Sequence, residues 1–166
     1  MVSNTKIKSS NDIKAILKRI AYQVYESNFE ENELIIVGIE KAGNQLAALL
    51  INELQTISSL SLTHVSLTLD KKNPRNSIHC DTNPSFLKNQ SIVIVDDVLN
   101  TGSTLIYAVN YFLQFPVKQI KTAVMVNRNH KKFPVKADFK GISLSTSINE
   151  HVTVVLEGEN SGIYLC

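Results

Sequence analysis

Two adjacent carboxylates, Asp96 and Asp97, follow a run of β-branched apolar residues, and this pattern can bind the hydroxyl groups of a sugar. The run Ile92–Val95 is typical of a parallel strand that is buried on both faces. Ligands of open α/β sheets bind just beyond the carboxyl ends of such strands. We therefore expect the two carboxylates at that edge, where at least one of them accepts hydrogen bonds from vicinal sugar hydroxyls.

A short polar turn comes directly after these carboxylates. Its residues are Asn100, Thr101, Gly102, Ser103 and Thr104. Such a turn, followed by a helix, presents backbone N–H groups, hydroxyls and a helix N-terminus to a phosphate, and its glycine lets the backbone approach closely. The alternative is an ordinary strand-to-helix turn, but a helix cap needs only one such residue. The carboxylates and the turn together predict a site for a phosphorylated sugar.

A second turn, from Gly38 to Gly43, also follows an apolar strand and opens a helix. Its last residues, Lys41, Ala42 and Gly43, can present backbone amides and one ammonium group to an anion. Because any strand-to-helix turn can contain glycine and lysine, a plain connection stays open as the alternative for this segment.

Apolar patterns predict the elements that must position these residues. Helical spacing occurs over residues 10–27, 43–54 and 104–113, with Ser10 as the expected cap of the first helix. Short apolar runs predict strands over residues 34–39, 65–69, 92–95, 120–126, 152–156 and 162–165. Strands that alternate with helices indicate an α/β fold, with an open, mostly parallel sheet and helices on both faces.

Two segments lack such patterns. The segment 71–89 is longer than the usual connection between two elements of a compact domain, so we expect it to form a flexible active-site loop. For each charged residue of this loop taken alone, namely Asp70, Lys71, Lys72 and Arg75, a solvated side chain is the expectation. The polar stretch 127–150 is expected to be irregular and to form a small hood over the carboxyl edge of the sheet.

Composition bounds the class of protein. The chain has 166 residues, and we expect residues 1–166 to form a single domain. The net charge of +2 is too small to indicate nucleic acid by itself. No apolar stretch reaches the ~20 residues that cross a bilayer, and Met1–Ser10 lacks the apolar core of a signal peptide. Since Cys80 and Cys166 make neither a disulfide framework nor a zinc site, we expect a reducing cytoplasm and no membrane partner.

The segment Ser91–Leu105 resembles the PRPP-binding signature of the type I phosphoribosyltransferases, in which an apolar strand, an acidic pair, a Thr-Gly-Ser-Thr turn and a helix follow in this order. Residues 127–141 are similar to the PyrR-type family of pyrimidine operon attenuators and uracil phosphoribosyltransferases, which carries Asp-Arg-Gly-His and then Ala-Asp-aromatic. The residues in step with that family are Arg128, His130, Pro134, Ala137, Asp138, Phe139 and Gly141. The resemblance extends from Ile13 to Leu156.

This resemblance implies a type I phosphoribosyltransferase fold and the transfer of the 5-phosphoribosyl group of PRPP to a nucleobase, uracil being favoured. By the same resemblance, Asp96 and Asp97 hold the ribose, Asn100 to Thr104 bind the 5′-phosphate, and Lys41 to Gly43 bind the pyrophosphate. Arg128, His130 and Asp138 are the candidates for the base side. Mg²⁺ is expected as a cofactor bound mainly through PRPP, with Asp96 or Asp97 as its protein contact, and family habit suggests a homodimer.

Departures from the family leave two alternatives open. The pyrophosphate turn lacks the family's arginine, and Leu69–Lys72 replaces Tyr-Arg-Asp-Asp at the start of the closing loop. These changes allow an RNA-binding regulator that senses nucleotides with little catalysis, although the altered first helix, Lys18–Tyr22, disfavours RNA. A purine phosphoribosyltransferase is the other alternative, and Asn100 counts against it because asparagine cannot take a proton where purine-specific relatives carry aspartate.

Overall fold

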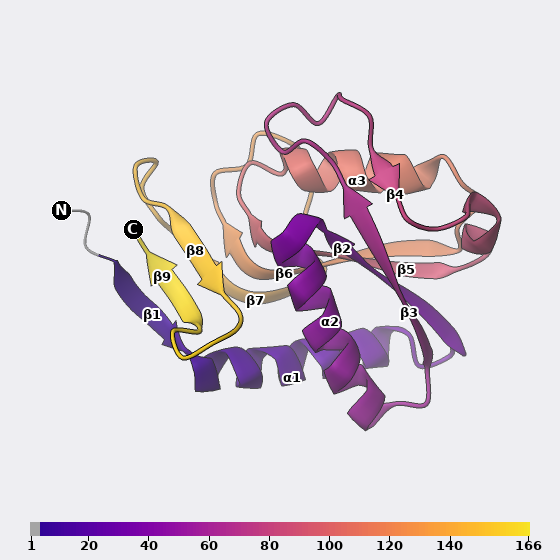
Figure 1. Cartoon of the computed structure of the whole chain (residues 1–166), viewed down its shortest axis with the longest axis horizontal. Coiled ribbons are helices and arrows are strands. Elements are labelled where there is room, and N and C mark those ends of the chain that lie inside the picture. Colours follow the sequence, from indigo (N-terminus) through magenta and orange to yellow (C-terminus); the bar gives the residue numbers. More distant parts are fainter. Residues whose placement is uncertain (1–3) are drawn as a thin grey trace.

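The computed structural model describes residues 4–166 and is built around a six-stranded sheet (Figure 1). In order across the sheet, its strands are β4 (His79–Cys80), β3 (Ser61–Thr68), β2 (Glu33–Ile39), β5 (Ser91–Leu99), β6 (Gln119–Arg128) and β7 (Phe139–Leu144). Neighbouring strands are parallel except β3 and β4. Because these strands are parallel, the carboxyl ends of β2, β5 and β6 meet at one edge of the sheet. Met1–Ser3, which begin the polar segment expected to lack a signal peptide, lie outside the described residues.

Helices cover both faces of this sheet (Figure 1). On one face lie α1 (Ser10–Ser27) and α2 (Glu40–Ile57), and on the other lie α3 (Ser103–Leu113) and the single 3₁₀ turn η1 (Pro84–Leu87). Side chains of β5 serve both layers, because Val93 and Val95 belong to the core under α1 and α2, whereas Ile92 and Ile94 belong to the core under α3. The predicted α/β fold, with a mostly parallel sheet between two helical layers, is confirmed.

A smaller antiparallel sheet joins the two ends of the described chain. It contains β1 (Thr5–Ser9), β9 (Gly162–Leu165) and β8 (Val152–Val155), in the order β1-β9-β8. Strands β8 and β9 were expected from their apolar runs, whereas β1 was not. Ile163 of β9 is buried in the core shared with α1, and β8 contacts β5, so this sheet packs against the central one.

The prediction that the stretch after Val126 is irregular is only partly right: residues 129–138 and 145–151 lie in no helix or strand, but the remainder belongs to β6 and β7. β6 continues to Arg128, and β7 adds a further parallel strand at the edge of the sheet. Along β7 the exposure alternates, with Phe139 and Gly141 buried and Lys140 exposed. A strand buried on one face only has few apolar residues, which is why its sequence looks like a polar connection. The segment 145–151 leads into the small sheet, and the hood expected of residues 127–150 stays a prediction.

Several boundaries also differ from the expected ones. The cap of α1 is Ser9 rather than Ser10: the Ser9 hydroxyl accepts from the Asp12 N–H at 3.2 Å, and the Asp12 carboxylate accepts from the Ser9 N–H at 2.8 Å. Helix α2 begins at Glu40 rather than Gly43, and the loop 71–89 contains β4 and η1. Among residues 4–166, no helix is both long enough and apolar enough to cross a membrane.

Candidate active site

The acidic pair lies inside β5, because this strand continues past the predicted end at Val95 to Leu99. Asp96 is buried, with 3% of its surface exposed, and Asp97 is partly exposed. The Asp97 N–H donates to Asp96 Oδ1 at 3.0 Å, which fixes the orientation of the buried carboxylate. The pair thus stands where β5 reaches the carboxyl edge of the sheet, as the sequence predicted.

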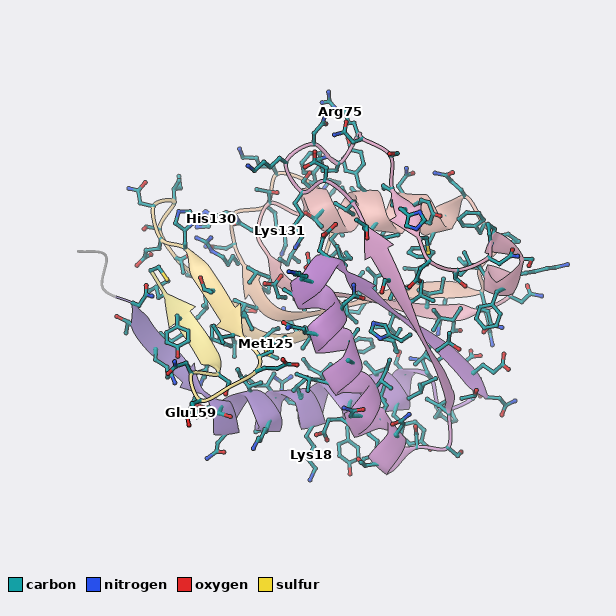
Figure 2. The ribbon with its side chains drawn as sticks, viewed as in Figure 1. Lys18, Arg75, Met125, His130, Lys131 and Glu159 are labelled. Atoms are coloured by element: carbon teal, nitrogen blue, oxygen red, sulfur yellow. The ribbon has the colours of Figure 1, made fainter. Side chains whose placement is uncertain are left out.

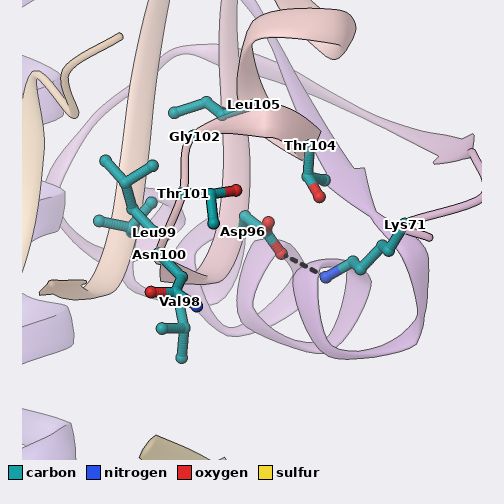
Figure 3. A pocket seen from close by; sticks show the side chains of 10 residues that line it. Lys71, Asp96, Val98, Leu99, Asn100, Thr101, Gly102, Thr104 and Leu105 are labelled. Carbon is teal, nitrogen blue, oxygen red and sulfur yellow. Dashed lines mark hydrogen bonds and ion pairs between the residues drawn. The ribbon is translucent and has the colours of Figure 1, made fainter. Parts of the chain in front are cut away.

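Lys71 is the counter-ion of this pair. Its Nζ lies 3.1 Å from Asp96 Oδ1 (Figure 3). The same Nζ lies 3.7 Å from Asp97 Oδ1. Burial raises the pKa of Asp96 to about 7, with Lys71 opposing the rise and Asp97 adding to it. Burial lowers the pKa of the Lys71 ammonium, but the two carboxylates outweigh that effect and its pKa is raised overall. The expectation that Lys71 is a solvated charge is therefore wrong.

The polar turn surrounds a cavity of about 200 Å³ at the N-terminus of α3 (Figure 3). Besides Lys71 and Asp96, this cavity is lined by Val98, Leu99, Asn100, Thr101, Gly102, Thr104, Leu105 and Val124. Ser103 does not line it; its N–H donates to Thr101 Oγ1 at 3.2 Å, which shapes the turn. Four of the five predicted phosphate-binding residues thus share one cavity with the buried carboxylate. The oriented N–H groups of a helix N-terminus suit an anion there.

Gly102 is required by both its conformation and its neighbours. Its φ of 85° lies in the left-handed region, and a Cβ there would stand 2.6 Å from Val135 Cγ1. The chain beyond β6 covers the turn, because the N–H groups of Lys132 and Phe133 donate to the Thr101 carbonyl at 2.8 and 3.1 Å. The turn 100–104 is therefore held by residues 132–133 as well as by α3.

We expect Gly102→Ala to destabilise the fold by about 2 kcal/mol and to weaken the binding of inorganic phosphate at least tenfold. The left-handed backbone is costly for alanine, and Val135 must move. Gly158→Ala is a matched control, since Gly158 also has a φ of 85° but nothing within 4 Å of the added Cβ. Urea denaturation and calorimetric phosphate titration of both variants measure the difference. Equal phosphate affinity in Gly102→Ala and the control would show that this turn does not bind phosphate.

The second turn is the first turn of α2, not a loop. Its Lys41 and Ala42 line a neighbouring cavity of about 430 Å³, together with Glu40, Leu69, Asp70, Lys71 and Lys72. Gly43 allows α2 to pack closely on β5, because a Cβ there would stand 2.7 Å from the Val95 carbonyl oxygen. The two predicted anion sites are thus adjacent, and Lys71 lines both cavities.

Arg128 and His130 contact the segment 146–150. The buried Arg128 guanidinium donates to Thr146 Oγ1 at 2.8 and 2.9 Å, to the Ser147 carbonyl at 3.2 Å and to the Glu150 carbonyl at 2.7 Å. His130 Nε2 lies 2.6 Å from the Thr146 carbonyl oxygen, and Figure 2 shows His130 beside the small sheet. The two side chains therefore connect the end of β6 to residues 146–150.

Asp138 lies apart from these groups. Its carboxylate accepts from the N–H and the hydroxyl of Thr122, at 2.8 and 3.1 Å, near the beginning of β6. It lines neither of the two cavities next to Lys71. The structure thus does not bring it to the acidic pair, and its predicted place at the base stays a prediction.

Sequence reasoning missed two contacts. Glu40 adopts a φ of 54°, and its carboxylate accepts from the Leu69 N–H at 2.7 Å, so α2 is connected to the start of the loop 71–89. Lys71 was the other omission, because no local pattern reveals a partner far away in the sequence. Arg75, in contrast, lies at the outer tip of this loop, as expected of a solvated charge (Figure 2).

Within residues 4–166, no three histidine, cysteine, aspartate or glutamate side chains gather to hold a metal ion.

Comparison with known proteins identifies the family. The family model described as phosphoribosyl transferase domain matches residues 3–157. The bifunctional protein PyrR of Citrifermentans bemidjiense is 32% identical, and that of Geobacter sulfurreducens 30%; each alignment covers 96% of this chain and 95% of the relative. Among solved structures, the hypoxanthine phosphoribosyltransferase of Trypanosoma cruzi has a TM-score of 0.82 at 16% identity, covering 99% of this chain and 97% of the other. A hypoxanthine-guanine phosphoribosyltransferase from Bacillus anthracis has a TM-score of 0.79 at 16% identity, with 96% and 95% covered. These two structures show the fold, and the sequence matches show that the chain belongs to the phosphoribosyl transferase domain family, as a PyrR-type, type I phosphoribosyltransferase.

Proposed function

We propose that this phosphoribosyltransferase transfers the 5-phosphoribosyl group of PRPP to N1 of uracil and releases pyrophosphate. The observation that carries the proposal is the cavity that joins the buried Asp96 to the turn Asn100–Thr104. A ribose 5-phosphate has its vicinal hydroxyls at one end and its phosphate at the other, and these two groups match the two ends of the cavity. The adjoining cavity at Lys41 and Ala42 offers a place for the pyrophosphate.

Catalysis in this proposal consists of positioning and of stabilising charge. Asp96 and Asp97 accept hydrogen bonds from the ribose hydroxyls and stabilise the positive charge that develops on the sugar. The turn Asn100–Thr104 binds the 5′-phosphate, and Lys41 with the first amides of α2 stabilises the leaving pyrophosphate. Mg²⁺, when bound through PRPP, supplies further positive charge to the pyrophosphate, and the carboxylate oxygens of the acidic pair are hard donors that fit it.

Uracil is favoured as the acceptor because Asn100 offers no proton acceptor for a purine nitrogen. Asn100 is exposed and lines the cavity, so a base placed there meets an amide rather than a carboxylate. Arg128 and His130 act on the base side through the hood segment 146–150, which they hold in place. The full-length matches to proteins named bifunctional protein PyrR support the same choice.

The test is to incubate the protein with Mg²⁺, PRPP and, in turn, uracil, hypoxanthine, guanine, xanthine and orotate, and to quantify the nucleotide formed. Formation of UMP supports the proposal. A purine nucleotide would keep the reaction but overturn the base assignment. Binding of UMP without any turnover would favour a regulatory protein instead.

A regulator that binds RNA is the second candidate, and the changed anion sites favour it. Ala42 stands where the family has arginine, and Lys71 is paired with the acidic residues. The first helix counts against it, because the Arg19 guanidinium donates to the carbonyls of Lys140 and Gly141 rather than remaining free for phosphates. A gel shift with pyrimidine leader RNA at several salt concentrations tests it, since nonspecific binding disappears as salt rises whereas sequence discrimination persists.

We also propose a homodimer in a reducing cytoplasm. The exposed apolar side chains of Tyr22 in α1 and Phe29 just after it offer contact surface for a second copy, and both cysteines are free thiols. Light scattering on the purified protein measures the oligomeric state.

A further inference from the structure

Lys71 is placed at the acidic pair by a turn that the sequence Leu69–Asn73 builds. The Asp70 carboxylate accepts from the N–H groups of Lys72 and Asn73 at 2.9 and 3.2 Å, and these hydrogen bonds hold the pKa of Asp70 below its ordinary value. Before the turn, the Leu69 N–H is bound by Glu40. Glu40 has a left-handed backbone, and such strain in a non-glycine residue persists where the surrounding structure requires it.

Two adjacent lysines leave this turn with different surroundings. The Lys71 ammonium pairs with both carboxylates, and 41% of its side chain remains exposed. Lys72 makes no ion pair with any residue that the structure describes. The pairing is therefore a property of one position and not of a generally basic loop.

The ammonium lies where the proposed function puts the sugar hydroxyls. The buried carboxylate of Asp96 already accepts two hydrogen bonds at Oδ1, one from Lys71 Nζ and one from the Asp97 N–H. A ribose hydroxyl that binds this carboxylate competes with Lys71 for it. An ammonium released from two carboxylates can pair again only with an anion that lies within reach of the same side chain.

That anion is available in the adjoining cavity. Lys71 lines this cavity as well as the first, opposite Lys41 and Ala42, where the proposed function puts the pyrophosphate. Ala42 contributes no charge there. Resting on the proposed function, we propose that Lys71 exchanges partners: its ammonium pairs with Asp96 and Asp97 until ribose hydroxyls take these carboxylates, and it then pairs with the diphosphate of PRPP. Lys71 thereby both restrains sugar binding and supplies a positive charge to the leaving group.

The exchange predicts effects of opposite sign for Lys71→Met. At pH 8.5, where Asp96 is ionised in the native protein, ribose 5-phosphate should bind about tenfold more tightly than to the unchanged protein, because no ammonium has to be displaced. Nucleotide formation from PRPP should fall by about tenfold or more, because the pyrophosphate loses a charge partner. Lys88 is exposed and lines neither cavity, so Lys88→Met is the matched control and should change neither quantity. Inorganic phosphate has no sugar hydroxyl to compete for the carboxylates and Lys71 lines its proposed cavity, so it should bind Lys71→Met no more tightly than the unchanged protein.

Calorimetry, the nucleotide assay and hydrogen exchange decide between the outcomes. Ribose 5-phosphate affinity that is unchanged or lower in Lys71→Met overturns the exchange, and so does unchanged nucleotide formation. A gain in affinity that inorganic phosphate shares also overturns it, because the effect would not arise from competition for the carboxylates. Should the unchanged protein bind no sugar phosphate, the proposed function fails by itself. Hydrogen exchange then still tests the pairing: amides of residues 70–78 should exchange faster in Lys71→Met than in Lys88→Met, and equal rates contradict it.

Discussion

Replacing Asp97 by asparagine is expected to lower the rate of nucleotide formation from PRPP by about 10²- to 10³-fold. The substitution keeps the shape of the side chain and removes its negative charge. Asp97 stands next to Asp96 at the edge of the sheet, and 21% of its side chain is exposed, so the lost charge was available to a ligand. Both the hydrogen bonds to the ribose and the stabilisation of positive charge on the sugar are weakened. Steady-state kinetics with the preferred base measure the loss.

The binding of inorganic phosphate separates this loss from a general disturbance of the site. In the proposed function phosphate binds at the turn Asn100–Thr104, whose cavity is not lined by Asp97, so its affinity should be unchanged. A variant that keeps full activity would show that the role given to the acidic pair is wrong. A variant that also loses phosphate affinity would show that the turn and the pair are one structural unit.

The region from Asp96 to Thr104 could be predicted because its geometry is local. A buried strand, a polar turn and a helix follow each other within a few residues, and the course of the chain alone brings the carboxylates close to the N-terminus of α3. The β-branched run 92–95 fixed the strand, since a parallel strand covered on both faces requires continuous apolar residues. The prediction ended this strand at Val95, four residues too early, because two charged residues in sequence are typical of the end of a buried strand.

Features that depend on distant pairing could not be predicted. Strand β1 is short and mostly exposed, and it forms against β9, with Thr5 opposite Leu165. The ion pair of Lys71 depends on the turn at Asp70 and on the path of the loop between β3 and β5. Arg128 was predicted at the base side, but its hydrogen bonds go to residues 146–150, a segment whose sequence shows no regular pattern. Each of these contacts joins residues whose separation in the chain carries no periodic signal.

Asp96→Asn is expected to have the second large effect, a gain of stability at neutral and alkaline pH. Burial raises the pKa of Asp96 from 3.8 to about 7. Between these two values the folded protein retains a proton that the unfolded chain has released, so this group makes the fold less stable as pH rises from 4 to 7. Above pH 7 the full loss of folding stability is present. Converted from the difference between the two pKa values, this loss amounts to at most about 4 kcal/mol.

Asparagine does not titrate, so the variant escapes this cost. Its advantage over the unchanged protein should be small near pH 4, should grow mainly between pH 5 and 7, and should reach a few kcal/mol at pH 8. Lys71 does not cancel the gain, because its side chain is 41% exposed and Asp97 remains as its partner. The carboxylates of Asp12, Asp70 and Glu150, whose pKa values are lowered, titrate equally in both proteins and drop out of the difference.

Urea denaturation of the two proteins at pH 5, 6, 7 and 8 measures this difference directly. A constant offset across the series would mean that Asp96 does not titrate in this range. Destabilisation at pH 8 would mean that the attraction between Lys71 and Asp96 exceeds the cost of burying the carboxylate. With the expected result, and with sugar binding lost in the same variant, Asp96 would be a residue whose charge the fold tolerates at a cost because the ligand site needs it.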